Sequence, residues 1–369
     1  MPKLRVAVLF GGQSVEHDVS IVSARSIMAA LDPEKYEAAP IAITRDGHWL
    51  PPPAARPLLA GLPEPEPSGA LAPEDVPALA VDHRASVAFG DFDVVFPVVH
   101  GTQGEDGTVQ GLLELAGIPY VGAGVLASAV GMDKATMKRV FREAGLPLAR
   151  FLVVLRHEWD RDKTPIVRQV AREIGYPCFV KPSNGGSSVG VSKVRTEEEL
   201  RNAMDLALLL DRKALVEEGL AARELECSVL GNDEPTASAI GEIVPAREFY
   251  DYEAKYHDER TGLVIPAQVP EQVASRLRAL AISAFRAIDC AGMARVDFFL
   301  RTADSALFVN EINTIPGFTQ VSMYPKLWEA SGISYSALVD RLIQLALERH
   351  REAQSLRAHY AETRREDAP

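Results

Sequence analysis

The sequence predicts an α/β protein with more than one domain, and two observations carry this prediction. Residues 5–10 form a segment of strand length that is apolar after Arg5 and is followed by Gly11 and Gly12, and residues 19–31 follow with apolar positions at helical spacing. A buried strand, a glycine turn and a helix in that order open α/β domains that bind a ligand at the turn. The length of 369 residues also exceeds that of most single domains.

The first part of the chain continues with two further strands. Residues 38–44 and 93–99 are apolar runs of strand length, and the second run ends at the polar glycine loop 100–107. We expect this loop to bind a ligand, because such loops lie at the carboxyl ends of strands in α/β sheets. Between the two strands, residues 51–77 contain nine prolines and no clear periodicity, which favours a solvated surface excursion without function.

A second region begins after a boundary near residues 125–133. Asp133 is placed to cap a helix that ends before Gly145 and Pro147. Further elements are predicted as strands over residues 151–155, 178–181, 189–194 and 214–217, and as helices over residues 166–174 and 197–210. From residue 224 the pattern is mostly strand, with helices over residues 271–288 and 334–356 and a charged tail, 362–369, that we expect to fray.

Charge and composition exclude several classes of protein. Lys and Arg number 39 against 51 Asp and Glu, and a net charge of −12 argues against a general nucleic-acid coat but leaves room for a local basic pocket. No apolar run approaches the roughly 18 residues of a membrane span. The three cysteines, Cys178, Cys227 and Cys290, are too widely spaced for a disulfide framework or a zinc cluster, so we expect each to be a small buried residue.

The segment after the predicted strand 178–181 indicates anion binding. The strand ends in Lys181, and residues 182–190 that follow are rich in glycine and serine, whose backbone amides can surround an anion. The loop is not a Walker A motif, because Gly190 is followed by Val191 and Ser192. A plain glycine hairpin is the alternative, and the lysine that enters the loop makes it less favoured.

Two short segments near the end of the chain predict a metal site. Alternation places Arg295 and Asp297 on one face of their strand, and Glu311 and Asn313 on one face of theirs. In a hairpin turning through residues 303–305, Asp297 lies opposite Glu311 and Arg295 opposite Asn313. Two carboxylates and an amide oxygen suit phosphate-bridged Mg²⁺, and the arginine can neutralise a transferring phosphoryl group. A solvated ion-pair face is the alternative, although the flanking apolar residues fit it poorly.

Two weaker signals concern the nucleotide. Acids at the end of the strand 214–217, namely Glu217 and then Glu224, suit a clamp for adenine and ribose, but such acids are usually just solvated. Residues 122–127 match the dinucleotide fingerprint Gly-x-Gly-x-x-Ala. The next predicted strand is followed by Arg156 and His157 instead of the required acid, which favours ATP over NAD.

Taken in order, seven segments resemble the D-alanine–D-alanine ligases, which are ATP-grasp enzymes of peptidoglycan precursor synthesis. These segments are residues 11–20, 100–107, 132–134, 180–190, 249–256, 295–297 and 310–317, within a match over residues 4–345. The resemblance implies an ATP-grasp fold of mixed α/β and α+β class. Its implied parts are a Rossmann-like (pre-ATP-grasp) N-terminal substrate domain, 1–130, a central ATP-grasp lobe, 131–220, and a C-terminal ATP-grasp lobe with the metal site, 221–369.

The resemblance also implies roles for individual residues around ATP and the metal. The phosphate-binding lysines would be Lys134 and Lys181, with Lys255 also reaching the phosphates. The adenine and ribose contacts would be Glu217, Leu220 and Glu224. The ligands of two Mg²⁺ (or Mn²⁺) ions would be Asp297, Glu311 and Asn313.

Further implied roles concern the amino-acid substrates. Glu16 is similar to the carboxylate that holds the ammonium of the first D-alanine, and Arg295 to the arginine that stabilises the tetrahedral intermediate. The other substrate contacts would be His100, Gly317, Ser322 and Met323, the last two against the second D-alanine. Ser187, Tyr256 and Glu16 resemble a hydrogen-bonded triad that closes a lid.

The implied reaction transfers a phosphoryl group from ATP to one D-alanine carboxylate, and the amine of a second D-alanine then attacks the acylphosphate. A ligase for D-lactate or D-serine is the nearest alternative, and the tyrosine at position 256 favours the D-alanine product. A non-catalytic ATP-binding regulator would lack one of the acids or lysines, whereas all are present. We expect a cytoplasmic homodimer that acts on ATP and D-alanine, with no nucleic-acid or membrane partner.

Overall fold

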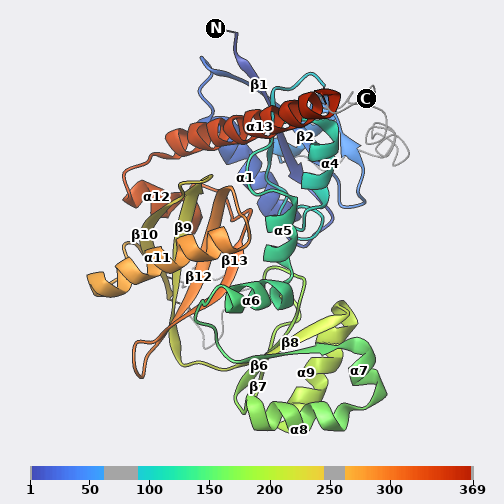
Figure 1. Cartoon of the computed structure of the whole chain (residues 1–369), viewed down its shortest axis with the longest axis vertical. Coiled ribbons are helices and arrows are strands. Elements are labelled where there is room, and N and C mark those ends of the chain that lie inside the picture. The colour runs from blue at the N-terminus through green and yellow to red at the C-terminus, as the bar shows by residue number, and fades with distance from the viewer. Residues whose placement is uncertain (1, 62–89, 245–261, 367–369) are drawn as a thin grey trace.

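The computed structural model describes residues 2–61, 90–244 and 262–366, with side chains as far as Leu356. In these ranges the chain forms three separate β-sheets with helices packed on their faces. Figure 1 shows the sheets in three bodies: the N-terminal one at the top, the C-terminal one at the left and the central one at the bottom. The predicted mixture of α/β and α+β structure is confirmed.

The N-terminal sheet has the order β3-β2-β1-β4. Its strands are β1 (Leu4–Gly11), β2 (Tyr36–Ile43), β3 (Trp49–Leu50) and β4 (Val94–Pro97), and β1 runs parallel to both β2 and β4. Helix α1 (His17–Ala30) follows the turn after β1 and packs on this sheet. Glycine is required at that turn, because Gly11 has a φ of +89° and a Cβ there would lie 2.1 Å from the carbonyl oxygen of Ile43.

The expectation of a solvated excursion from residue 51 onward is wrong for its first part. Helix α2 (Pro52–Leu59) buries Ala55 and Leu58 in the same apolar core as β1 and β4. Prolines at the first helical positions cost little, because the amides there have no intrahelical partner. Residues 62–77 of the expected excursion lie outside the described residues.

The central sheet has the order β5-β8-β6-β7. Its strands are β5 (Phe151–Leu155), β6 (Cys178–Pro182), β7 (Ser192–Val194) and β8 (Lys213–Glu218). Three helices accompany it: α7 (Arg156–Arg161), α8 (Lys163–Glu173) and α9 (Glu197–Leu210). Trp159, Val180, Leu200 and Val216 are buried together in its core. The predicted strands and helices of this region are confirmed, except that the strand expected over residues 189–194 is formed only by residues 192–194, and α7 was not anticipated.

The C-terminal sheet has the order β11-β10-β9-β12-β13. Its strands are β9 (Ala222–Gly231), β10 (Thr236–Val244), β11 (Gly262–Val264), β12 (Gly292–Arg301) and β13 (Leu307–Asn313). Helix α11 (Glu271–Ala287) covers one face of this sheet and packs against apolar side chains of β9 and β12. Helix α12 (Met323–Ala330), which the sequence pattern did not predict, contacts β9 and β10 with Met323 and Leu327 packed on Ile243.

Three helices connect the first sheet to the others: α4 (Thr108–Ala116), α5 (Val125–Met132) and α6 (Lys134–Glu143). The predicted cap of α6 is confirmed, since the carboxylate of Asp133 accepts a hydrogen bond from the amide of Thr136 at 2.9 Å. Met137 and Phe141 anchor α6 in the core of the C-terminal sheet. This anchoring directs the first residue of α6 toward the space between the sheets.

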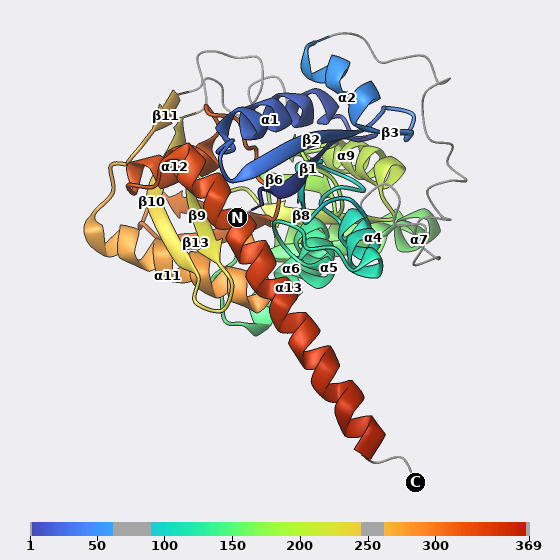
Figure 2. The same ribbon diagram turned by 90° about the horizontal axis from the view of Figure 1, so that it is seen from above.

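The last helix, α13 (Tyr335–Glu366), returns to the first body. Leu338, Val339 and Leu342 are buried in one core with Val6 and Phe96. Figure 2 shows the end of α13 projecting away from the rest of the molecule. Of the charged tail, residues 362–366 continue this helix, and residues 367–369 lie outside the described residues.

Two expectations from composition can be compared with the structure. The three cysteines are free and buried, which confirms the prediction that they are small core residues. Among the described residues, no helix has the length and apolar character needed to cross a membrane.

Candidate active site

A cavity of about 1270 Å³ lies where the three bodies meet. The residues that the sequence analysis selected and that line it are Glu16, His100, Lys134, Lys181, Ser187, Glu217, Leu220, Glu224, Arg295, Asp297, Glu311, Asn313, Gly317, Ser322 and Met323. Lys255 and Tyr256, the two remaining candidates, lie outside the described residues. The structure therefore brings together side chains from all three sheets around one space.

The acidic wall of the cavity is the hairpin of β12 and β13. Its register pairs Arg295 with Asn313 and Asp297 with Glu311, as the alternation predicted. The guanidinium of Arg295 donates two hydrogen bonds of 2.7 Å to the carboxylate of Asp297, and the amide of Asn313 donates one of 3.0 Å to the same group. These contacts fix the orientation of the carboxylate at the cavity wall.

A third acid near this wall, Glu226 on β9, was missed by the sequence analysis. It pairs with Asp297 in the sheet, and its carboxylate lies 2.9 Å from the guanidinium of Arg295. Although burial lowers the pKa of Arg295, the carboxylates of Asp297 and Glu226 raise it well above its usual value. The signal that could have revealed Glu226 is its position two residues after Glu224, on the same face of the strand.

The donor set of this wall fits a hard divalent cation. The oxygens of Asp297, Glu311 and Asn313 are the ligand types that Mg²⁺ and Mn²⁺ prefer. Among the described residues, no three His, Cys, Asp or Glu side chains gather closely enough to form a metal site alone. A cation held here would therefore also take oxygen from Asn313 and from its substrate, as Mg²⁺ does when it bridges phosphates.

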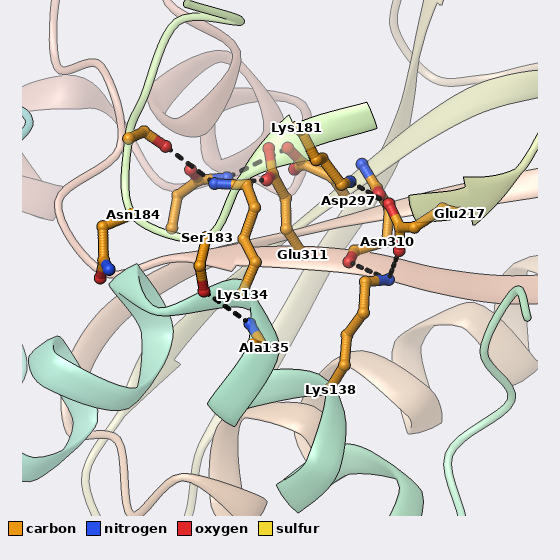
Figure 3. A network of polar contacts seen from close by, with 12 residues as sticks. Lys134, Ala135, Lys138, Lys181, Ser183, Asn184, Glu217, Asp297, Asn310 and Glu311 are labelled. Carbon is orange, nitrogen blue, oxygen red and sulfur yellow. Dashed lines mark hydrogen bonds and ion pairs between the residues drawn. The ribbon is translucent and has the colours of Figure 1, made fainter. Parts of the chain in front are cut away.

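The basic side of the cavity comes from α6 and β6 (Figure 3). The ammonium of Lys134 donates to the carbonyl of Gly185 at 2.8 Å and lies 3.4 Å from the carboxylate of Glu311. Lys181 forms an ion pair with Glu217. Although burial lowers the pKa of Lys181, the carboxylates of Glu217 and Glu311 raise it overall, so the group is a cation at neutral pH.

Glu217 lies between two lysines. One carboxylate oxygen is 2.5 Å from the ammonium of Lys138 and the other pairs with Lys181. Burial raises the pKa of Glu217, but the two lysines together bring it down to about 2. Both carboxylate oxygens of Glu217 are thus engaged by lysines, and Leu220 and Glu224 line the same cavity.

The glycine-serine loop after β6 closes the cavity over the N-terminal body. The hydroxyl of Ser187 donates to the carboxylate of Glu16, and both Ser187 and Ser188 have a positive φ, +49° and +58°. A Cβ on Gly186 would lie 2.8 Å from the carboxylate of Glu16. Glycine at position 186 therefore permits the close approach of the loop to this acid.

The remaining substrate candidates lie near the start of α12. His100 is buried, with one ring nitrogen 3.1 Å from the hydroxyl of Ser23 and the other 3.0 Å from the carbonyl of Ile315. The hydroxyl of Ser322 accepts from the amide of Thr319 at 3.0 Å. These contacts hold the loop before α12 against the N-terminal body.

Two acids near α6 predict a loss of stability in acid. Although partial burial raises the pKa of Asp133, hydrogen bonds from Lys213, Thr136 and Ser183 bring it to about 2, as it is for Glu217. Because the pKa of each carboxyl is lower in the folded than in the unfolded protein, each ionised carboxylate adds to the free energy of unfolding above about pH 4.5. This contribution is lost as the pH falls toward 2. We expect the free energy of unfolding, measured in urea from pH 7 to 2.5, to fall in this window.

Asp133→Asn tests this origin because asparagine keeps the helix cap but removes the charge opposite Lys213. Between pH 5 and 2.5, the free energy of unfolding of the variant should fall by roughly 1 kcal/mol less than that of the wild type. Asp160→Asn on the exposed side of α7 is the matched control and should follow the wild-type curve. An acid-induced loss of equal size in Asp133→Asn would contradict the assignment.

Comparison with known proteins finds relatives over nearly the whole chain. A family model described as the D-ala D-ala ligase N-terminus matches residues 5–123, and one described as its C-terminus matches residues 140–344. The chain is 49% identical to the D-alanine–D-alanine ligase of Geobacillus thermodenitrificans (96% of this chain, 98% of the relative) and 52% identical to that of a Thermoanaerobacter species (95% and 99%).

Two solved structures are similar over almost the whole chain. The D-alanine–D-alanine ligase from Coxiella burnetii has a TM-score of 0.81 and 38% identity, covering 99% of this chain and 100% of that one. The VanG D-Ala:D-Ser ligase from Enterococcus faecalis has a TM-score of 0.81 and 33% identity, covering 94% and 100%.

The three sheets around a cavity with lysines on one wall and paired acids on the other define an ATP-grasp enzyme, as the sequence resemblance implied. Within that class, the two family models and the full-length relatives settle the assignment. The chain belongs to the D-alanine–D-alanine ligase family.

Proposed function

We propose that this protein joins two molecules of D-alanine to D-alanyl-D-alanine with consumption of ATP, for the synthesis of peptidoglycan precursors. The observation that carries the proposal is that one cavity is lined by three kinds of group: a carboxylate that could bind an ammonium, lysines that could bind phosphates, and a pair of acids that could bind a metal. The relatives that match the chain over nearly its full length are named D-alanine–D-alanine ligases. The N-terminal domain, 1–130, and the two ATP-grasp lobes, 131–220 and 221–369, would each supply one part of this cavity.

ATP would lie between the central and C-terminal sheets. Leu220 and Glu224, with the main chain of Glu217, would contact the adenine and the ribose hydroxyls. Lys134 on α6 and Lys181 on β6 reach the cavity from different elements, so their ammonium groups would neutralise the triphosphate from two sides. Because phosphoryl transfer depends on positioning and charge neutralisation, no side-chain nucleophile is needed.

The first D-alanine would bind through its ammonium to Glu16, whose carboxylate Ser187 already orients. Its carboxylate would attack the γ-phosphorus of ATP to give D-alanyl phosphate and ADP. The amine of the second D-alanine, held near Ser322, Met323 and Gly317, would attack the acyl carbon and release phosphate. Arg295 would stabilise the tetrahedral intermediate, since its guanidinium is a permanent cation at the cavity wall.

The metal assignment is the finer part of this proposal. Asp297, Glu311 and Asn313 would hold two Mg²⁺ (or Mn²⁺) ions, which would neutralise charge on the triphosphate. The three side chains face one another across a single hairpin, and their oxygens match the preference of these ions.

The cellular setting is also proposed. A cytoplasmic enzyme is supported by the use of ATP, and the net charge of −12 supports the absence of nucleic-acid and membrane partners. We propose a homodimer, as the family resemblance implies. Sedimentation equilibrium should give a mass near twice the 40.1 kDa of one chain, and a mass equal to one chain would contradict the dimer.

Product analysis tests the proposed activity directly. Purified protein with ATP, Mg²⁺ and D-alanine should form D-alanyl-D-alanine, ADP and phosphate in equal amounts, measured by mass spectrometry and phosphate release. L-alanine is the matched control and should give no dipeptide. Phosphate release without dipeptide would contradict the ligase assignment, and a preference for D-lactate or D-serine as the second substrate would contradict the assignment to D-alanine.

A further inference from the structure

Lys138 on α6 is a buried lysine that the proposed reaction does not use. Its side chain is 1% exposed, and Lys138 is not among the residues that line the cavity. A lysine cation rarely lies in the interior unless a carboxylate pairs with it, because burial strongly favours the neutral form. Burial lowers the pKa of Lys138 accordingly, and the carboxylate of Glu217 offsets this effect only in part.

The ammonium of Lys138 has two oxygen partners on two sheets (Figure 3). One is the carboxylate of Glu217 on β8, at 2.5 Å, and the other is the carbonyl of Asn310 on β13, at 3.2 Å. The carbonyl is accessible because the ladder slips here: Asp297 pairs with Glu311 and Phe298 with Val309, so Asn310 is the unmatched residue of a β-bulge. The bulge thus holds Lys138 at Glu217 and away from the cavity.

The two lysines on Glu217 differ in what they can reach. Lys181 lines the cavity, whereas Lys138 is enclosed behind it. When a triphosphate enters, the ammonium of Lys181 gains a competing anionic partner, and moving toward it weakens its pair with Glu217. A buried carboxylate without a cation is strongly unfavourable, so this movement needs a second cation that stays with Glu217.

We propose that Lys138 is the resident counter-ion of Glu217, and that it thereby frees Lys181 to transfer its ammonium from Glu217 to a phosphate of ATP. This inference rests on the proposed function, because the triphosphate is the partner that Lys181 gains. Lys138 is a positioning residue here, since it touches neither substrate nor reacting atom. Lys138 therefore affects the binding of ATP and not the binding of D-alanine.

The test combines two variants. In Lys138→Met, Lys181 becomes the only cation on Glu217, so ATP must compete with that carboxylate for it. We expect Mg·ATP to bind at least about 10-fold more weakly by titration calorimetry, with the KM for D-alanine within twofold of the wild type. In Lys138→Met with Glu217→Gln the competing carboxylate is gone, so this double variant should bind Mg·ATP at least about threefold more tightly than Lys138→Met.

A structural role for Lys138 predicts a different pattern. If the residue only supported packing, the double variant would bind ATP as weakly as Lys138→Met or more weakly, so a second loss in place of recovery would overturn the proposal. Unchanged ATP affinity in Lys138→Met would also overturn it. Lys163→Met is the matched control, because Lys163 pairs with Asp205 on the exposed side of the central body, and it should leave ATP binding unchanged.

Thermal unfolding of each variant shows whether a loss of ATP binding is caused by a loss of folded structure. Should Lys138→Met fail to fold, Lys138→Gln takes its place, because glutamine can still donate a hydrogen bond to Glu217 but carries no charge, and it should bind Mg·ATP at least about 10-fold more weakly than the wild type. A folded Lys138→Gln that binds Mg·ATP within about threefold of the wild type would then refute the role of Lys138. A wild type that binds no ATP would refute the proposed function instead, which distinguishes the two failures.

Discussion

Replacing Glu311 with glutamine is expected to lower kcat for D-alanyl-D-alanine formation by roughly 10³-fold, about 4 kcal/mol of transition-state stabilisation. Glutamine keeps the size of the side chain and removes the charge that a divalent cation requires. The carboxylate lies opposite Asp297 in the hairpin and 3.4 Å from Lys134, so it is next to another proposed metal ligand and to a lysine proposed to bind phosphate. Steady-state kinetics with saturating ATP and D-alanine give the measurement.

The same hairpin supplies the control. Asp304 lies at its turn and pairs with Arg301 in solvent, so Asp304→Asn should leave turnover unchanged. Excess chelator should stop the wild-type reaction, and added Mg²⁺ or Mn²⁺ should restore it. Turnover that persists in chelator, or Glu311→Gln with near-normal kcat, would contradict the metal assignment at Asp297, Glu311 and Asn313.

Lys181→Ala carries the second large effect. We expect kcat/KM for ATP to fall by about 10²-fold or more, because the variant removes a permanent cation from a cavity where little water screens the triphosphate. The fall in kcat/KM should be smaller for D-alanine, since Lys181 pairs with Glu217 at the proposed ATP-binding end of the cavity. Kinetics with ATP varied at fixed D-alanine, and then the reverse, separate the two.

Lys163→Ala on the same central body is the control for this effect, because its ammonium pairs with Asp205 at the surface. Near-normal kinetics and nucleotide affinity in Lys181→Ala would show that the loop after β6 does not bind phosphate. A fall of equal size for both substrates would point to a general loss of structure, which thermal unfolding of the variant would reveal.

Local patterns in the sequence determined most of the elements and the position of the site on them. Alternation along β12 and β13 was sufficient to place Asp297 opposite Glu311, because side chains on a strand alternate between faces and a short turn sets the register. The helix cap at Asp133 and the loop after Lys181 could likewise be predicted, since capping and glycine-rich turns depend on residues close in sequence.

Two helices, α2 and α12, were not predicted from the sequence. The prolines from residue 51 onward concealed α2, whose helix is stabilised by the burial of Ala55 and Leu58 against the first sheet. Helix α12 is short, and its apolar residues face two different cores. In both cases tertiary packing outweighed the local preference of the chain.

Only the tertiary structure decided which charges meet. The sequence by itself determined the family, the order of the motifs and the identity of Lys181 and Glu217 as site residues. It did not show that Lys138 shares Glu217 with Lys181, or that Glu226 supports Arg295. Such pairs join elements far apart in the chain, and their strength comes from exclusion of water, which exists only once the sheets have packed together.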